Sequence, residues 1–79
     1  MVNEEEIKEE DRKIRRLRRM VDFTMALIVG SDMTLEEASM HAGSVRELAL
    51  QLFPGKGHVF DMVYAPRLRR LLTDKYRLS

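Results

Sequence analysis

Two histidines, His41 and His58, are the side chains of this sequence best suited to bind a metal ion or to transfer protons near neutral pH. Glu37 precedes His41 by four residues, so the two side chains would share one face of a helix. Protein zinc sites use at least three ligands, and the chain has no cysteine to supply another. We therefore interpret Glu37 and His41 as a surface contact and expect no metal site.

The other residue types used in catalysis also lack suitable neighbours. The segment Pro54–Gly57 holds a lysine between two glycines, but it is too short for a phosphate-binding loop and no strand is expected before it. The serines stand in no nucleophile motif; they are Ser31, Ser39, Ser44 and Ser79. We therefore expect a protein that is not an enzyme and that binds no cofactor.

The length of 79 residues fits one small domain. No apolar run approaches the roughly 18 residues that a membrane-spanning helix needs, so we expect no membrane partner. The N-terminus is acidic, whereas a secretory signal begins with positive charge. Together with the absence of cysteine, these features favour a cytoplasmic protein.

Charge is strongly segregated along the chain although the net charge is only +1. Residues 1–11 carry a net charge of −5, and residues 12–19 carry +6. Because these blocks nearly cancel, net charge does not indicate a nucleic-acid partner. We interpret the run as the solvated face of a helix.

The N-terminal third of the chain predicts one long helix with Asn3 as its N-cap. An apolar residue recurs every seven positions, at Ile7, Ile14, Val21 and Ile28. The apolar flanking residues begin only near Val21, so we expect residues 1–13 to form a charged, partly solvated helical arm. Residues 14–79 are expected to form a single helical domain.

A second helix is predicted from Thr34, whose capping box with Glu37 follows a turn at residues 30–33. The short connection predicts an antiparallel helical hairpin. Pro54 ends this element, and a third helix follows near His58. We expect it either to kink at Pro66 or to end near Tyr64, with a new helix starting at Pro66. The expected fold is therefore all-α, a small three-helix domain.

The central segment carries a Thr-x-x-Glu opening, an Ala-Gly pair and a closing Phe-Pro-x-Lys, which begin at Thr34, Ala42 and Phe53 respectively. With this pattern, residues 30–56 resemble the helix-turn-helix of tetracycline-repressor-type regulators. The resemblance implies a turn at 41–44 and a recognition helix over 44–53. The DNA-contacting residues that it implies are Arg46, Glu47, Gln51 and Lys56.

The residues of the same segment also fit one unbroken helix. Its apolar positions keep a single helical phase across Gly43, whereas a turn would reset that phase. An interior glycine costs only about 0.5–1 kcal/mol relative to alanine. Ser44 and Glu47 have the spacing of a second capping box, which favours a break instead. We favour the continuous helix and keep the break as the alternative.

The sequence thus favours a non-enzymatic helical module that binds itself or another protein through the apolar seam of the first helix. The predicted interface residues are Ile14, Leu17, Val21, Met25 and Ile28. The alternative is a helix-turn-helix DNA-binding protein or transcription regulator, for which nucleic acid is the partner.

Overall fold

The computed structural model describes residues 3–77, and its secondary structure within them is entirely helical. Four helices follow one another along this part of the chain: α1 (Glu4–Gly30), α2 (Leu35–Leu52), α3 (Gly57–Val63) and α4 (Ala65–Tyr76). The predicted all-α class is confirmed. Residues 1–2 and 78–79, which include the end of the predicted arm and Ser79, lie outside the described residues.

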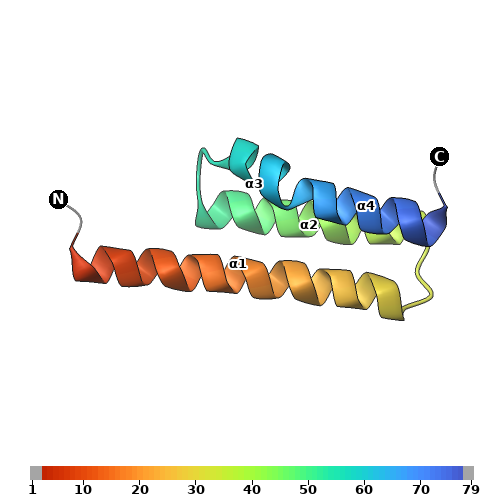
Figure 1. The fold of residues 1–79 in the computed structure, drawn as a ribbon, viewed down its shortest axis with the longest axis horizontal. Helices are drawn as coiled ribbons and strands as arrows, with labels where there is room; N and C mark the ends of the chain where they lie inside the picture. The colour runs from red at the N-terminus through yellow and green to blue at the C-terminus, as the bar shows by residue number, and fades with distance from the viewer. Residues whose placement is uncertain (1–2, 78–79) are drawn as a thin grey trace.

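Helices α1 and α2 form the predicted antiparallel hairpin, joined by a short connection (Figure 1). Asn3 caps α1, since its side-chain oxygen accepts a hydrogen bond from the Glu6 backbone N–H at 2.8 Å. Thr34 caps α2 in the same way, accepting from the Glu37 backbone N–H at 3.1 Å, and the Glu37 carboxylate accepts from the Thr34 backbone N–H. Both predicted caps are therefore present, and each satisfies backbone donors that a helix start leaves unpaired.

The last part of the described chain forms two separate helices, α3 and α4, which is the second of the two arrangements expected at Pro66. The described residues therefore hold four helices instead of the three of the expected domain. Tyr64 lies at the junction, where it is both the C-cap of α3 and the N-cap of α4. Pro66 occupies the first turn of α4, where its missing N–H needs no partner inside the helix. Proline therefore starts a new helix here, instead of bending an existing one.

Helices α2 and α4 lie side by side and pack against α1, with α3 crossing near the end of α2 (Figure 1). All four helices contribute to the buried core cluster, which consists of Leu17, Val21, Val45, Ala49, Phe60 and Leu68. The core residues of α1 and α2 come from the predicted apolar stripes.

The end of α4 is fastened to the α1–α2 connection. The Lys75 ammonium donates hydrogen bonds to the backbone carbonyls of Ile28 and Ser31. The Tyr76 hydroxyl donates to the Met33 carbonyl at 2.7 Å. Carbonyls at a helix C-terminus carry partial negative charge, so a cation is well placed there. This end of the bundle is closed by polar contacts.

The opposite end of the bundle is open. Helix α1 continues past the end of α2, and its first turns project beyond the other three helices (Figure 1). We call residues 4–13 the arm; at about 1.5 Å per residue it is roughly 15 Å long. The described chain is accordingly elongated, with principal extents of 48 × 22 × 16 Å.

Candidate functional site

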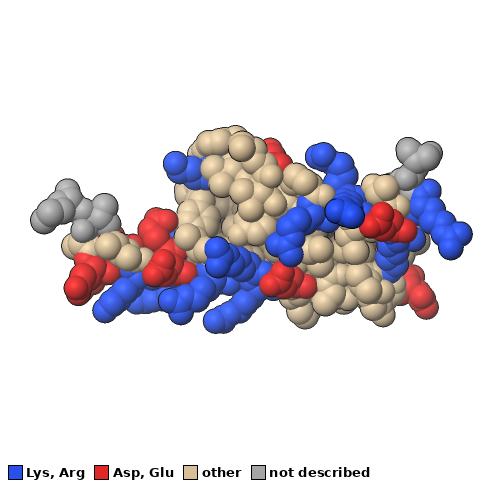
Figure 2. Space-filling model, viewed as in Figure 1, with Lys and Arg blue, Asp and Glu red and all other residues tan. Residues whose placement is uncertain are grey.

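A groove of about 280 Å³ lies where α1 passes the end of α2 and the start of α3. We call it the end groove. Its surface is mostly apolar, and it is lined by Ile14, Leu17, Arg18, Ala49, Phe53, Lys56, Val59, Phe60, Val63 and Tyr64. Figure 2 shows a largely uncharged surface over α3, whereas charged side chains crowd the arm. The groove is thus an apolar hollow at the open end of the bundle.

The floor of the end groove is buried, but its walls are exposed. Leu17 and Phe60 belong to the core, whereas Val63 remains 51% exposed and Val59 is also exposed. Helix α3 has only seven residues and turns Phe60 inward, so the neighbouring valines have no helix to cover them. The groove therefore presents apolar side chains that the chain itself does not bury.

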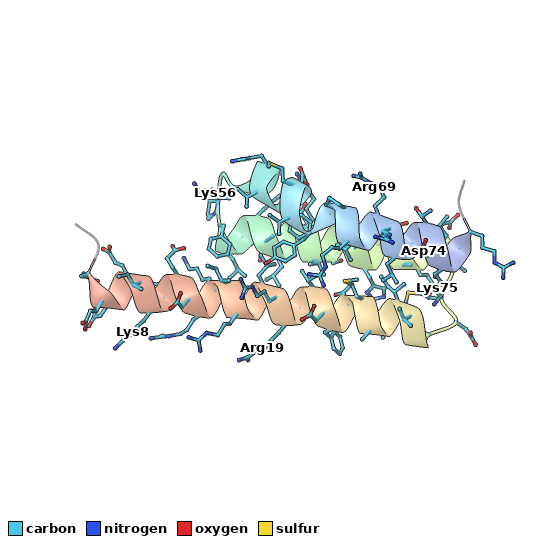
Figure 3. The ribbon with its side chains drawn as sticks, in the orientation of Figure 1. Lys8, Arg19, Lys56, Arg69, Asp74 and Lys75 are labelled. Atoms are coloured by element: carbon cyan, nitrogen blue, oxygen red, sulfur yellow. The ribbon has the colours of Figure 1, made fainter. Side chains whose placement is uncertain are left out.

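One exposed apolar residue of the arm, Ile7, lies in line with the groove, separated from Ile14 by Glu10 and Asp11. Ile14 lines the groove and is exposed, and Ile7 lies two turns earlier on the same side of α1 with 51% of its surface exposed. Charged side chains flank this line. Arg18 and Lys56 belong to the groove lining, and Figure 3 places Lys56 at the end of α2, near α3.

The arm itself is acidic and exposed. Residues 4–11 hold six acids and one base, and residues 12–19 hold six bases and no acid. Lys13 lies 4.0 Å from Glu9 in an exposed pair, which contributes little energy. An acidic helical segment thus projects directly from a basic one at the open end of the bundle.

The predicted interface on α1 needs correction. Val21 and Ile28 are 0% exposed and Leu17 is also buried, so these side chains form the core of the folded chain. Met25 is half-buried and packs against that core, and only Ile14 of the predicted set is exposed. Seven-residue periodicity marks the side of a helix that packs, but it does not distinguish α2 and α4 of the same chain from a second chain.

Helix α2 is continuous through residues 41–44, which confirms the prediction of one unbroken helix over this segment. The Ser44 hydroxyl donates to the Met40 carbonyl at 3.0 Å. This is the bond that a serine makes inside a helix, where its side chain points back one turn. Ser44 therefore does not act as the cap of a new helix.

Arg46 turns toward α3, where its guanidinium binds both carboxylate oxygens of Asp61, at 2.9 and 3.0 Å. This hydrogen bond and the attraction between the charges raise the pKa of Arg46 and lower the pKa of Asp61. The other three residues of the DNA-binding interpretation are not part of this ion pair. Glu47 and Gln51 are exposed on α2, and Lys56 lies at the end groove.

The polar residues considered first for chemistry remain on the surface. Glu37 is engaged in the capping box, and both histidines are exposed. Within residues 3–77, no group of three or more His, Cys, Asp or Glu side chains converges as a metal site would require. No helix in the same range has both the length and the apolar character needed to cross a membrane.

Comparisons of the chain with protein-family models, with curated proteins and with solved structures find no match.

The structure adds Arg18, Val59 and Val63 to the candidate site, none of which was among the predicted interface residues. The sequence placed the two valines on the apolar side of the last helix, but a seven-residue helix is too short for periodicity to separate buried from exposed apolar positions.

Proposed function

We propose that this protein is a non-enzymatic helical interaction module that binds a second copy or another protein through one surface. That surface consists of the end groove and the apolar line of the arm, and we call it the docking surface. The observation that carries the proposal is that Ile7, Ile14, Val59 and Val63 remain exposed together at the open end of the bundle. Adjoining apolar side chains bordered by charges are typical of protein-binding sites.

The shape of the docking surface suits a helix. Helix α2 covers one side of α1 from the hairpin connection as far as Ile14. Residues 4–13 of α1 lie beyond the end of α2. A helix laid alongside the arm would extend the α1–α2 packing by about two turns and bury Ile7 and Ile14. Amphipathic helices bind apolar grooves in this manner, with anchor residues spaced by three, four or seven positions.

Site-specific photo-crosslinking tests the proposal. A photoreactive amino acid in place of Val63, which is exposed in the groove wall, should yield a covalent adduct in the native host cell. The matched control replaces Glu36, which is exposed at the start of α2, far from the groove. An adduct from position 63 but not from position 36 supports the docking surface. No adduct from positions 63, 59 or 14 would refute it.

Nucleic-acid binding is the second candidate, and one feature of α1 favours it. Four arginines spaced over two turns share the outer side of this helix and lie close together: Arg12, Arg15, Arg16 and Arg19. Such a group suits phosphate contacts, and it favours a binding element on α1 over one on α2. Fluorescence anisotropy with labelled duplex DNA across a salt series tests this role. Affinity that falls steeply with salt supports it, and no binding at low salt refutes it.

A further inference from the structure

We propose that the helix bound at the docking surface is the arm of a second copy of this chain, in an antiparallel dimer with two-fold symmetry. This inference rests on the proposed function, because it names the occupant of the same surface. In such a dimer each arm lies against α1 and the end groove of the other copy. The same contact therefore forms twice around the axis, as a two-fold interface requires.

The charge pattern of α1 selects this occupant. The acidic residues 4–11 and the basic residues 12–19 are adjacent blocks of nearly equal length. Antiparallel pairing about an axis near residues 10–11 sets residues 4–9 of each copy, with four acids and one base, against residues 12–17 of the other, with four bases and no acid. Only Glu10 and Asp11, at the axis itself, meet their own counterparts. Parallel pairing would instead set acid beside acid and base beside base, which is repulsive. A single helix thus carries both halves of a complementary pair.

The apolar residues fit the same register. An axis near residues 10–11 places Ile7 of each copy opposite Ile14 of the other, so both exposed isoleucines are covered in both copies. Glu6 and Lys13 each immediately precede one of these isoleucines. Residues at such flanking positions pair with each other across antiparallel helices, which brings Glu6 of one copy near Lys13 of the other.

The opposite flank of the apolar line is also complementary. Glu4 lies three residues before Ile7, and Arg18 lies four residues after Ile14, so the register brings Glu4 of one copy near Arg18 of the other. Arg18 lines the end groove together with Lys56. The rim of the groove is therefore basic where the acidic arm would enter it.

The end groove completes the contact. The arm of the second copy would run antiparallel to α1, as α2 does, and would begin where α2 ends. Its Ile7 then reaches the exposed walls of the groove at Val59 and Val63. A nucleic acid would use the basic block but would leave these apolar walls and the acidic arm without contacts. An acidic helix with an isoleucine anchor would contact the basic block, the apolar walls and the arm together. The arm of this chain is such a helix.

Sedimentation equilibrium of the full chain at low salt tests the dimer. The expected mass is twice the 9.3 kDa of one chain. Two charge-reversed variants, Glu4→Lys/Glu6→Lys and Lys13→Glu/Arg18→Glu, should each dissociate about tenfold or more readily, because like charges then face each other. Mixing the two variants should restore the dimer mass, because each Glu4–Arg18 and Glu6–Lys13 pair in the mixed dimer is again of opposite charge.

A matched control reverses charges on the other side of the same helix. Lys8 and Arg19 point away from α2 and α4 (Figure 3), so Lys8→Glu/Arg19→Glu changes the net charge as much as Lys13→Glu/Arg18→Glu does. This control should keep the dimer mass. Ile7→Asp should lose it with an unchanged helical circular-dichroism spectrum, because Ile7 lies outside the core.

Three results would overturn the dimer. The parent chain could keep the mass of a single chain up to about millimolar concentration, or Lys8→Glu/Arg19→Glu could weaken the dimer as much as Lys13→Glu/Arg18→Glu does. The third result is a mixture of the two charge-reversed variants that does not regain the dimer mass. A crosslinked adduct from position 63 to a different protein, together with a single-chain mass, would overturn the dimer but keep the proposed function. Absence of any adduct would reject the proposed function itself. The two failures are therefore distinguishable.

Discussion

Replacing Gly43 with alanine should stabilise the protein. Gly43 lies inside the continuous helix α2, and its φ is not positive. A Cβ atom built on it meets no heavy atom within 4 Å, so the added methyl group causes no clash and gains no packing. The remaining effect is the conformational entropy that glycine loses on folding, which makes it about 0.5–1 kcal/mol less favourable than alanine inside a helix.

The expected shift is measurable by thermal denaturation. In domains of about 60–100 residues, 1 kcal/mol changes the melting temperature by about 4–8 °C, so Gly43→Ala should raise it by roughly 2–8 °C. Circular dichroism at 222 nm follows the loss of helix. Parent and variant must be compared at one protein concentration, because self-association would make the melting temperature depend on concentration.

Gly55→Ala is the matched control for this prediction. Gly55 also has open space around its missing Cβ, but its φ is +78°, in the left-handed region that alanine disfavours. The same substitution should therefore lower the melting temperature at position 55 and raise it at position 43. A lower melting temperature for Gly43→Ala would show that residue 43 needs a glycine conformation. That result would refute the continuous helix and favour the turn that the resemblance to DNA-binding regulators implies.

Three further substitutions test local contacts. Thr34→Ala removes the cap of α2 and should lower the free energy of unfolding by about 1 kcal/mol in urea denaturation. Tyr76→Phe removes the hydrogen bond to the Met33 carbonyl and should cost about 0.5–1.5 kcal/mol by the same measurement, and no loss would show that water replaces the hydroxyl. The carboxyl group of Asp61 should titrate below its ordinary value of 3.8 by NMR and return toward it in Arg46→Gln. Because the folded pKa is lowered, the stability from this pair is present above pH 3.8 and is lost as pH falls through the folded value.

Much of the fold follows from local patterns in the sequence. The caps at Asn3 and Thr34 and the stripe on α2 each depend on residues within one or two turns, and the structure contains all of them. The break at Tyr64 was harder to predict, because proline is compatible both with a kinked helix and with the first turn of a new one. Contacts between α3 and the end of α2 favour the second arrangement here.

Of the exposed apolar residues in the proposed docking surface, only Ile14 was predicted from the sequence to lie in an interface, and the reason is physical. The periodicity of a helix indicates which of its side chains are kept from water. Whether α2, α4 or a second chain covers the apolar side of α1 depends on the lengths of these helices. Helix α2 ends at Leu52, so it covers Val21 and leaves Ile14 exposed. A longer α2 would have buried Ile14 and Ile7 within one chain. The end of α2, which proline and glycine residues enforce, therefore decides where the interior stops and the docking surface begins.

The segregated charge of α1 is best explained by the same boundary. Beside α2 and α4, the buried side of α1 is apolar, and its bases lie on the surface. Beyond α2, a helix with alternating charges would satisfy its own side chains through pairs four residues apart. Here the acids and bases are instead sorted into two blocks on either side of residue 11, so most of their attraction is available to a second molecule. The acids of the first turn suit the dipole of a single helix, and two antiparallel copies also bring most of each acidic block against the basic block of the other. A mixed dimer of the two charge-reversed variants tests that distinction directly.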